Sequence, residues 1–283
     1  MIKAKILVVG CGDLGTAIAM HLQVKYEVIG LKRSQQSLQS TMRTIQADVT
    51  NRESLAELTD LKPNIIIYCV SADAQTDESY QAQYVQGLKN ILAMQTNNNA
   101  LQHVFFVSST RVYGQQTQAI LDESIPAIPA DFGGERLLEA EKVIKNFSCN
   151  STSMRLSGIY GANRLMLVNL AKEVNRWPSS NHWSNRIHRD DAASFISFMV
   201  EKAIQKLPVE DCYIVTDDMP TQHYEVLTWL AKAQSIDLIN VKIPETRGGK
   251  RLSNKRLRAT GFVLQYPNYQ IGYEAVLKLQ KNA

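Results

Sequence analysis

Short apolar runs alternate with amphipathic segments along most of this chain. Each run is flanked by polar or turn residues, which is typical of buried strands joined by helices. Expected strands are Lys5 to Val9, Glu27 to Leu31, Thr44 to Ala47, Asn64 to Val70, His103 to Ser108, Thr152 to Leu156 and Asp211 to Thr216. Expected helices include Arg52 to Thr59, Ser79 to Gln95, Gly134 to Asn146 and Ala192 to Val200. The alternation predicts an α/β protein with a doubly wound parallel sheet of the Rossmann type.

The alternation weakens after residue 160, where Trp, His, Asn and Arg become frequent. We therefore expect a Rossmann core from residues 1–160, completed by 187–218. Residues 161–186 and 219–283 would form a smaller substrate-binding lobe, mainly C-terminal. No internal repeat or low-complexity tract interrupts this organisation.

The first strand runs directly into a G-x-G-x-x-G turn formed by Gly10, Gly12 and Gly15. In such turns one glycine allows the tight turn, the next lets pyrophosphate approach bare backbone, and the third lets helix pack on strand. Asp13 and Leu14 begin the helical pattern whose N-terminus would face the phosphates. Because a strand precedes the turn, and a helix and second strand follow it, the unit predicts dinucleotide binding.

The end of the second strand indicates which dinucleotide is preferred. An acid there would bind the ribose of NAD, but this chain has Lys32, Arg33 and Ser34. Two cations and a hydroxyl suit the 2′-phosphate of NADP, and NAD is the alternative cofactor. These residues could also form an ordinary solvated basic loop without a role in binding. Asp48 could reach the adenine or be an ordinary loop acid. Val70 and Ser71, at the end of a later strand, complete the expected cofactor contacts.

Composition bounds the class of protein. The 283 residues are 45% hydrophobic, and a formal charge of +4 without basic stretches interleaved with aromatics argues against nucleic acid as a partner. Four scattered cysteines predict neither a disulfide framework nor a metal site. With no apolar run long enough for a signal or membrane span, we expect no membrane partner and a cytoplasmic location.

Several motifs together resemble the extended short-chain dehydrogenase/reductases, the epimerase/dehydratase group. Residues 107–114 (VSSTRVYG) are similar to its S-S-x-x-V-Y-G motif, residues 155–161 to its R-x-x-x-x-Y-G run, and residues 187–193 to its I-H-V-D-D-x-A run. The glycine spacing is closest to an atypical, YeeZ-like subgroup. The resemblance implies a dinucleotide enzyme in which Ser109 touches the reacting oxygen, and members of the group often form homodimers.

One part of the family pattern is missing. The family's Y-x-x-x-K pair handles a proton, but at that spacing this chain has Phe132 and Arg136, and no tyrosine lies between Tyr113 and Tyr160. Arg136 could still bond the nicotinamide ribose. Glu135 and Tyr113 remain candidate proton donors or acceptors, although a helix-start carboxylate and a packed turn residue are the bland alternatives.

Aromatic and basic residues gather in the segment expected to bind substrate. Four of these residues, Arg164, Trp183, Arg186 and His188, suit a planar or phosphorylated small molecule, such as a nucleotide-linked one, or alternatively a dimer contact. His188 could instead cap the helix that follows it. The basic segment 247–258 is either a solvated face or a diphosphate contact.

Two functions remain open from the sequence. The first is an NADP-dependent oxidoreductase or epimerase-like enzyme with Ser109 polarising an oxygen. The second is a non-catalytic NADP-binding sensor or scaffold, which the replacement of the tyrosine and lysine by Phe132 and Arg136 favours. Steady NADPH consumption with a physiological substrate would decide for the first.

Overall fold

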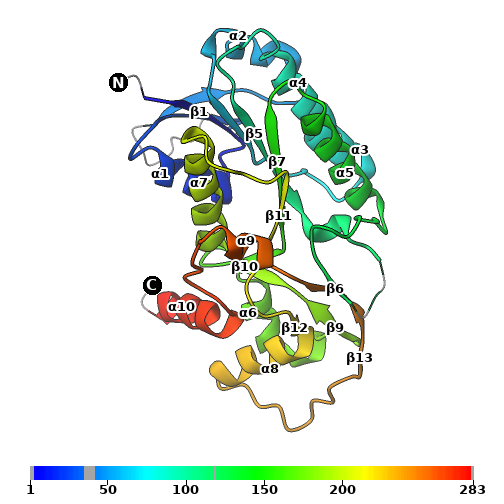
Figure 1. Cartoon of the computed structure of the whole chain (residues 1–283). Helices are drawn as coiled ribbons and strands as arrows, with labels where there is room; N and C mark the ends of the chain where they lie inside the picture. The colour runs from blue at the N-terminus through cyan, green and yellow to red at the C-terminus, as the bar shows by residue number, and fades with distance from the viewer. Residues whose placement is uncertain (1–2, 35–41, 116, 118, 282–283) are drawn as a thin grey trace. The chain divides into compact units, whose positions relative to one another are not determined.

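The computed structural model describes residues 3–34, 42–115, 117 and 119–281. Its main feature is a seven-stranded parallel sheet in the spatial order β11-β7-β5-β4-β1-β2-β3 (Figure 1). The strands are β1 (Lys5–Val9), β2 (Glu27–Lys32), β3 (Arg43–Gln46), β4 (Ile65–Tyr68), β5 (His103–Ser109), β7 (Asn150–Leu156) and β11 (Cys212–Val215). The predicted fold class is confirmed, and each expected strand overlaps one of these.

The strand order fixes where a ligand can bind. Along the chain the sheet grows outward from β1 in one direction to β2 and β3, then from β4 in the other direction to β5, β7 and β11. Both β2 and β4 pair in parallel with β1. The loops after β1 and β4 therefore separate at a topological switch point, where doubly wound sheets open a crevice. The apolar cores of β1 and β4, Ile6–Val9 and Ile65–Tyr68, are completely buried, as strands covered on both faces should be.

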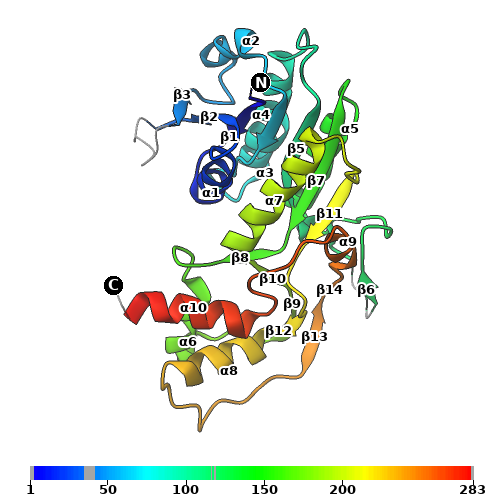
Figure 2. The same cartoon turned by 60° about the vertical axis from the view of Figure 1, so that its left-hand side comes forward.

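Helices cover both faces of this sheet. Figures 1 and 2 show α1 (Asp13–Leu22) and α7 (Arg189–Ile204) on one face, and α3 (Asp77–Tyr80), α4 (Gly87–Ala93) and α5 (Phe132–Lys145) on the other. The side chain of Asp131 caps the N-terminus of α5, because its Oδ1 accepts the Gly134 N–H at 2.9 Å. Such a cap satisfies a helix N–H that has no partner within the helix.

Two predicted helices differ in detail. The expected helix 52–59 is a 3₁₀ turn (Arg52–Leu55) followed by α2 (Leu58–Leu61), because Ala56 N–H bonds Glu53 O and shortens the turn. The expected helix 79–95 begins at Asp77, since Thr76 Oγ1 accepts the Ser79 N–H. Its middle, Gln81–Gln86, is π-helical.

Contacts divide the chain into two compact units. Unit 1 comprises Met1–Gly114, Ala127–Arg155 and Ala192–Tyr213, and unit 2 comprises Gln115–Pro126, Leu156–Asp191 and Ile214–Ala283. Unit 2 has short strands, namely β6 (Ile120–Leu121), β8 (Gly158–Tyr160), β9 (Asn181–Ser184), β10 (Arg186–His188), β12 (Thr221–Gln222), β13 (Thr246–Gly249) and β14 (Arg251–Leu252). Its helices are α6 (Met166–Lys172), α8 (His223–Ala233), α9 (Lys255–Ala259) and α10 (Tyr269–Lys281), with short 3₁₀ turns at Thr110–Val112 in unit 1 and Val174–Arg176 in unit 2.

Unit 2 has its own apolar core. Val168, Leu227, Leu230 and Tyr273 are buried in one cluster that joins α6, α8 and α10. Within each helix the members of the cluster lie three or four positions apart, as Val168 and Ala171 do in α6, so each helix presents an apolar face to the others. Among the described residues, no helix is long and apolar enough to cross a membrane.

Candidate functional site

The turn after β1 presents open backbone at a helix N-terminus. Gly10 has a φ of +93°, which favours glycine, and its N–H bonds Leu31 O at 2.9 Å. A Cβ on Gly15 would lie 2.1 Å from Gly10 O, so helix and strand could not pack as closely with any other residue. A Cβ on Gly12 would meet no atom within 4 Å. The space beside the Gly12 Cα is therefore open to a ligand, and the N–H groups of the first turn of α1 point toward that end of the helix.

A cavity of about 300 Å³ adjoins this turn within unit 1. Seven of the residues predicted to contact a cofactor line it together, namely Gly10, Gly12, Lys32, Arg33, Ser34, Val70 and Ser71. They come from the ends of β1, β2 and β4, on either side of the switch point. The chemistry of this lining, with bare backbone, two cations and hydroxyls, fits a phosphorylated dinucleotide.

Other predicted cofactor residues lie outside that lining. Leu14 and Gly15 are buried behind the turn, and Asp13 is the first residue of α1. The carboxylate of Asp48 accepts hydrogen bonds from the N–H and hydroxyl of Thr50, at 2.8 and 2.7 Å, so it caps its own turn. Its neighbours Ala47 and Val49, rather than Asp48, line the cavity.

Arg33 is held by an acid that the sequence did not indicate. Its two terminal nitrogens donate to the two carboxylate oxygens of Asp73, at 2.6 and 2.5 Å. Asp73 follows β4, and the Arg33 guanidinium lowers the pKa of its carboxyl group. The basic end of β2 thus has a carboxylate partner from another strand of the sheet.

Ser109 ends β5 and shapes the turn that follows. Its Oγ accepts the Arg111 N–H at 3.1 Å, and Arg111 extends to Tyr80, whose hydroxyl lies 2.7 Å from Arg111 Nη1. The Tyr80 ring packs edge-on against Phe132, with the ring centroids 5.4 Å apart. A phenol and a cation therefore meet beside the residue that occupies the family's tyrosine position.

The other residues predicted to act in catalysis are either hydrogen-bonded to neighbouring side chains or exposed to solvent. Tyr113 is fully buried, and its hydroxyl accepts from Arg155 at 2.7 Å, which favours its interpretation as a packed turn residue. Glu135 is exposed in the first turn of α5. Arg136 is held by Asp77 through two hydrogen bonds of 2.6 and 2.9 Å and also by Glu139, so contact with a cofactor ribose would compete with these acids.

Unit 2 contains a separate cavity of about 540 Å³. Arg164 and Arg186, both predicted to bind substrate, line it together with Asn163, Asn185 and His223. Arg186 is only 4% exposed; its Nη2 donates to Ser184 Oγ at 2.7 Å, and its Nη1 is buried with no partner among the residues that the structure describes. A buried guanidinium with an unused donor is costly unless an anion completes it.

Two further predicted substrate residues lie outside this lining. His188 is buried, its Nδ1 faces the Asp190 N–H at 3.2 Å, and burial lowers its pKa. This arrangement favours the alternative that His188 caps the start of α7. Trp183 packs against Arg251, whose guanidinium carbon lies 5.1 Å from the ring centroid. The basic segment 247–258 thereby contributes at least one residue to an aromatic contact.

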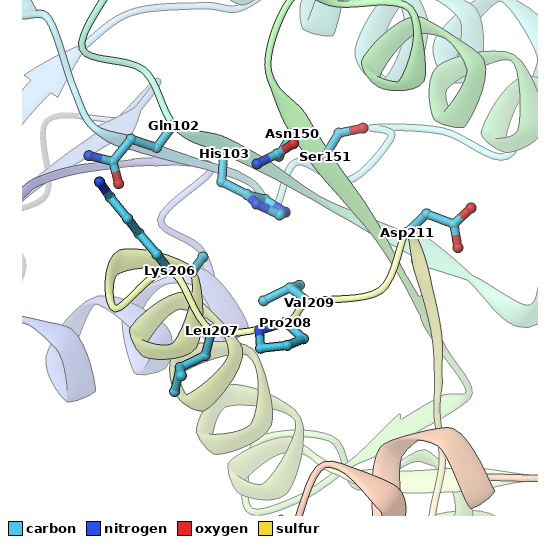
Figure 3. Close-up of a pocket in the computed structure, with 10 residues that line it drawn as sticks. Gln102, His103, Asn150, Ser151, Lys206, Leu207, Pro208, Val209 and Asp211 are labelled. Carbon is cyan, nitrogen blue, oxygen red and sulfur yellow. The ribbon is translucent and has the colours of Figure 1, made fainter.

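A further cavity, of about 730 Å³, lies elsewhere in unit 1. His103 begins β5 and Asn150 begins β7, so this cavity lies at the amino ends of strands, opposite to the glycine turn. Figure 3 shows Lys206 extending toward Gln102. His103 bonds Thr152 Oγ1 at 2.8 Å, and burial lowers its pKa to about 4, so it remains neutral there. None of the predicted site residues lies in this lining.

Several residues that line the dinucleotide cavity are absent from the sequence prediction. Gln83 lines the dinucleotide cavity from the π-helical segment, and Cys11, Leu31 and Cys69 line it through the strand ends. Cys69 could have been inferred from its place one residue before Val70, whereas nothing in the sequence pattern marks Gln83, Asp73 or Tyr80. In the described part of the chain, no group of three His, Cys, Asp or Glu residues is arranged as metal ligands.

Comparison with known proteins gives a consistent assignment. The family model for the NAD-dependent epimerase/dehydratase family matches residues 6–212. A structure from Methylobacillus flagellatus, provisionally described as an NAD-dependent epimerase/dehydratase, is 44% identical, covers 98% of this chain and 99% of its own, and has a TM-score of 0.90. The search among curated proteins found no significant match.

Two more distant structures share the fold. A provisionally described epimerase from Burkholderia cenocepacia is 19% identical with a TM-score of 0.80, covering 100% of this chain and 99% of its own. The UDP-glucose 4-epimerase of Thermus thermophilus, solved with NAD, is 17% identical with a TM-score of 0.73, covering 95% and 96%.

Proposed function

Because this chain belongs to the NAD-dependent epimerase/dehydratase family, we propose that it is an NADP-dependent oxidoreductase or epimerase-like enzyme acting on a small, nucleotide-linked substrate. The observation that carries the proposal is the open backbone at Gly12 beside a cavity that gathers seven predicted cofactor contacts. When bound, a nicotinamide dinucleotide supplies hydride transfer. Residues 1–160 with 187–218 would hold it, and residues 161–186 with 219–283 would bind substrate.

The basic end of β2 supports NADP over NAD. Lys32, Arg33 and Ser34 all line the cavity, and β2 ends without a carboxylate. A guanidinium binds a phosphate through two parallel hydrogen bonds, and a lysine adds a point charge. NAD offers neither cation a phosphate at this position, and Arg33 would keep Asp73 as its partner.

The cavity of unit 2 supports an anionic substrate. Arg186 Nη1 is a buried donor, and Arg164 lines the same space. UDP-glucose, the substrate in the name of the Thermus protein, carries a diphosphate of the kind that such a guanidinium binds. We assign the substrate's phosphate groups to Arg186.

Proton transfer would need a group other than Phe132. Ser109 offers a hydroxyl at the carboxyl end of β5, which would polarise the reacting oxygen. Tyr80 adds a phenol beside Phe132, and the Arg111 guanidinium donates a hydrogen bond to its oxygen. We propose Ser109 and Tyr80 as the pair that replaces the missing tyrosine chemistry.

The experiment begins with calorimetric titration of NADP⁺, NADPH and NAD⁺, followed by a screen of UDP-glucose and related nucleotide sugars for absorbance changes of the nicotinamide. Ser109→Ala and Tyr80→Phe should each lower turnover while cofactor affinity stays within about twofold of wild type. Equal rates in the variants and the wild type would remove that residue from the mechanism. A wild-type protein that binds no dinucleotide would refute the proposed function itself.

A non-catalytic NADP-binding sensor or scaffold is the second candidate. The replacement of the family's tyrosine by Phe132 favours it, because an aromatic ring without a hydroxyl exchanges no proton. A sensor would bind one redox state of the cofactor much more tightly and show no turnover. Similar affinity for both states, with steady NADPH consumption, would exclude it.

A further inference from the structure

Arg33 already has a carboxylate partner at the edge of the dinucleotide cavity. The guanidinium lines the dinucleotide cavity and is already paired with Asp73 through both terminal nitrogens, at 2.6 and 2.5 Å. These are the two donors that a 2′-phosphate would require. A phosphate and the Asp73 carboxylate therefore compete for the same face of Arg33.

Asp73 is fixed in place by contacts of its own. Its Oδ2 also accepts from Gln83 Nε2 at 3.0 Å, and its backbone N–H bonds Ser79 Oγ at 3.1 Å. Gln83 is 5% exposed, and its backbone carbonyl accepts the Tyr68 hydroxyl. Both side chains of the pair are about half exposed, 52% for Arg33 and 48% for Asp73, so a phosphate can approach Arg33 from solvent, and Asp73 keeps its bond to Gln83 when Arg33 leaves it.

We propose that Asp73 is a specificity-determining residue that restrains NADP binding, because the 2′-phosphate must take Arg33 away from it while NAD leaves the pair intact. This inference rests on the proposed function, since it requires the cavity beside Gly12 to hold the dinucleotide. It places the acid that governs cofactor choice after β4, although such acids are usually found at the end of the second strand.

The test compares affinities of the full-length protein for NADP⁺ and NAD⁺ by calorimetry at low salt. Asp73→Asn keeps the shape of the side chain but removes its charge. The dissociation constant for NADP⁺ should fall about fivefold, the factor that an exposed ion pair supplies, while that for NAD⁺ stays within about twofold. In Arg33→Gln/Asp73→Asn this gain should disappear.

Glu57→Gln is the matched control. It releases Arg43 from another exposed ion pair and changes net charge equally, but neither residue lines the cavity. It should alter neither affinity. If Asp73→Asn leaves NADP⁺ binding unchanged, weakens it, or strengthens both cofactors equally, Asp73 does not determine specificity. A wild-type protein that binds neither cofactor overturns both the dinucleotide site and this inference, whereas unchanged selectivity overturns the inference alone.

Discussion

Replacing Gly12 by alanine should abolish dinucleotide binding without harming the fold. Gly12 has a φ of −79°, an ordinary value for alanine, and its added Cβ would meet no protein atom within 4 Å. Alanine is a poorer helix cap than glycine, but it also restricts the unfolded chain, and each effect is worth about 0.5–1 kcal/mol. Since they oppose each other, the melting temperature should move by no more than about 2 °C.

The effect on binding should be much larger. The new methyl group would occupy the surface where pyrophosphate must approach the backbone N–H groups of the turn. Each hydrogen bond to a charged group contributes about 1.5–3 kcal/mol, so the loss of two amounts to at least about 3 kcal/mol. That corresponds to a loss of affinity of roughly 100-fold or more.

Calorimetry with NAD⁺ and NADP⁺, beside thermal melting, measures both quantities. Gly15→Ala is the contrasting variant, because its Cβ would lie 2.1 Å from Gly10 O and should destabilise the fold itself. If Gly12→Ala is stable and binds either cofactor as tightly as wild type, pyrophosphate does not pass over this turn. The assignment of the cavity would then be refuted.

Two predictions concern stability. Glu141→Gln should lower the free energy of unfolding in urea by about 3–5 kcal/mol, because it leaves the nearly buried Arg155 guanidinium without its carboxylate. The double variant Glu141→Gln/Arg155→Met should recover much of this loss. A single variant as stable as wild type would contradict the prediction. Burial raises the pKa of Asp217 from 3.8 to about 7, so the folded protein binds a proton there that the unfolded chain releases above pH 4. The contribution of Asp217 to folding stability therefore declines as pH rises toward 7. The stability of Asp217→Asn relative to wild type should increase by about 2–3 kcal/mol when the pH is raised from 5 to 8. A stability difference that does not depend on pH would refute the raised pKa of Asp217.

The sheet could be predicted because its strands carry the signal in their own residues. Continuous apolar runs such as Ile65–Tyr68 have few alternatives to a buried strand, and the glycine turn marks the first crossover. Boundaries were less certain because side-chain caps set them. The Thr76 side chain caps a helix that begins at Asp77, two residues before the predicted start. An i→i+3 hydrogen bond at Ala56 separates the predicted helix 52–59 into a 3₁₀ turn and α2.

The site was only partly predictable for a different reason. Contacts that follow a strand end, such as Lys32 and Ser71, can be found once the fold is known. Contacts between separate segments leave no local pattern, and Asp73 pairing with Arg33 is of this kind. The same applies to Tyr80, which reaches Arg111 across 31 positions of sequence. The family assignment is confirmed, whereas the narrower YeeZ-like assignment stays a prediction.

The thiol within the glycine turn has a consequence for oxidative stress. Cys11 lines the dinucleotide cavity, yet it is 7% exposed, donates to Val8 O, and has a pKa raised to about 11 by burial. At neutral pH about one molecule in ten thousand carries the reactive thiolate. Peroxides and alkylating agents attack thiolates, so the turn that would contact pyrophosphate should keep its sulfur unmodified while exposed thiols elsewhere in a cell react.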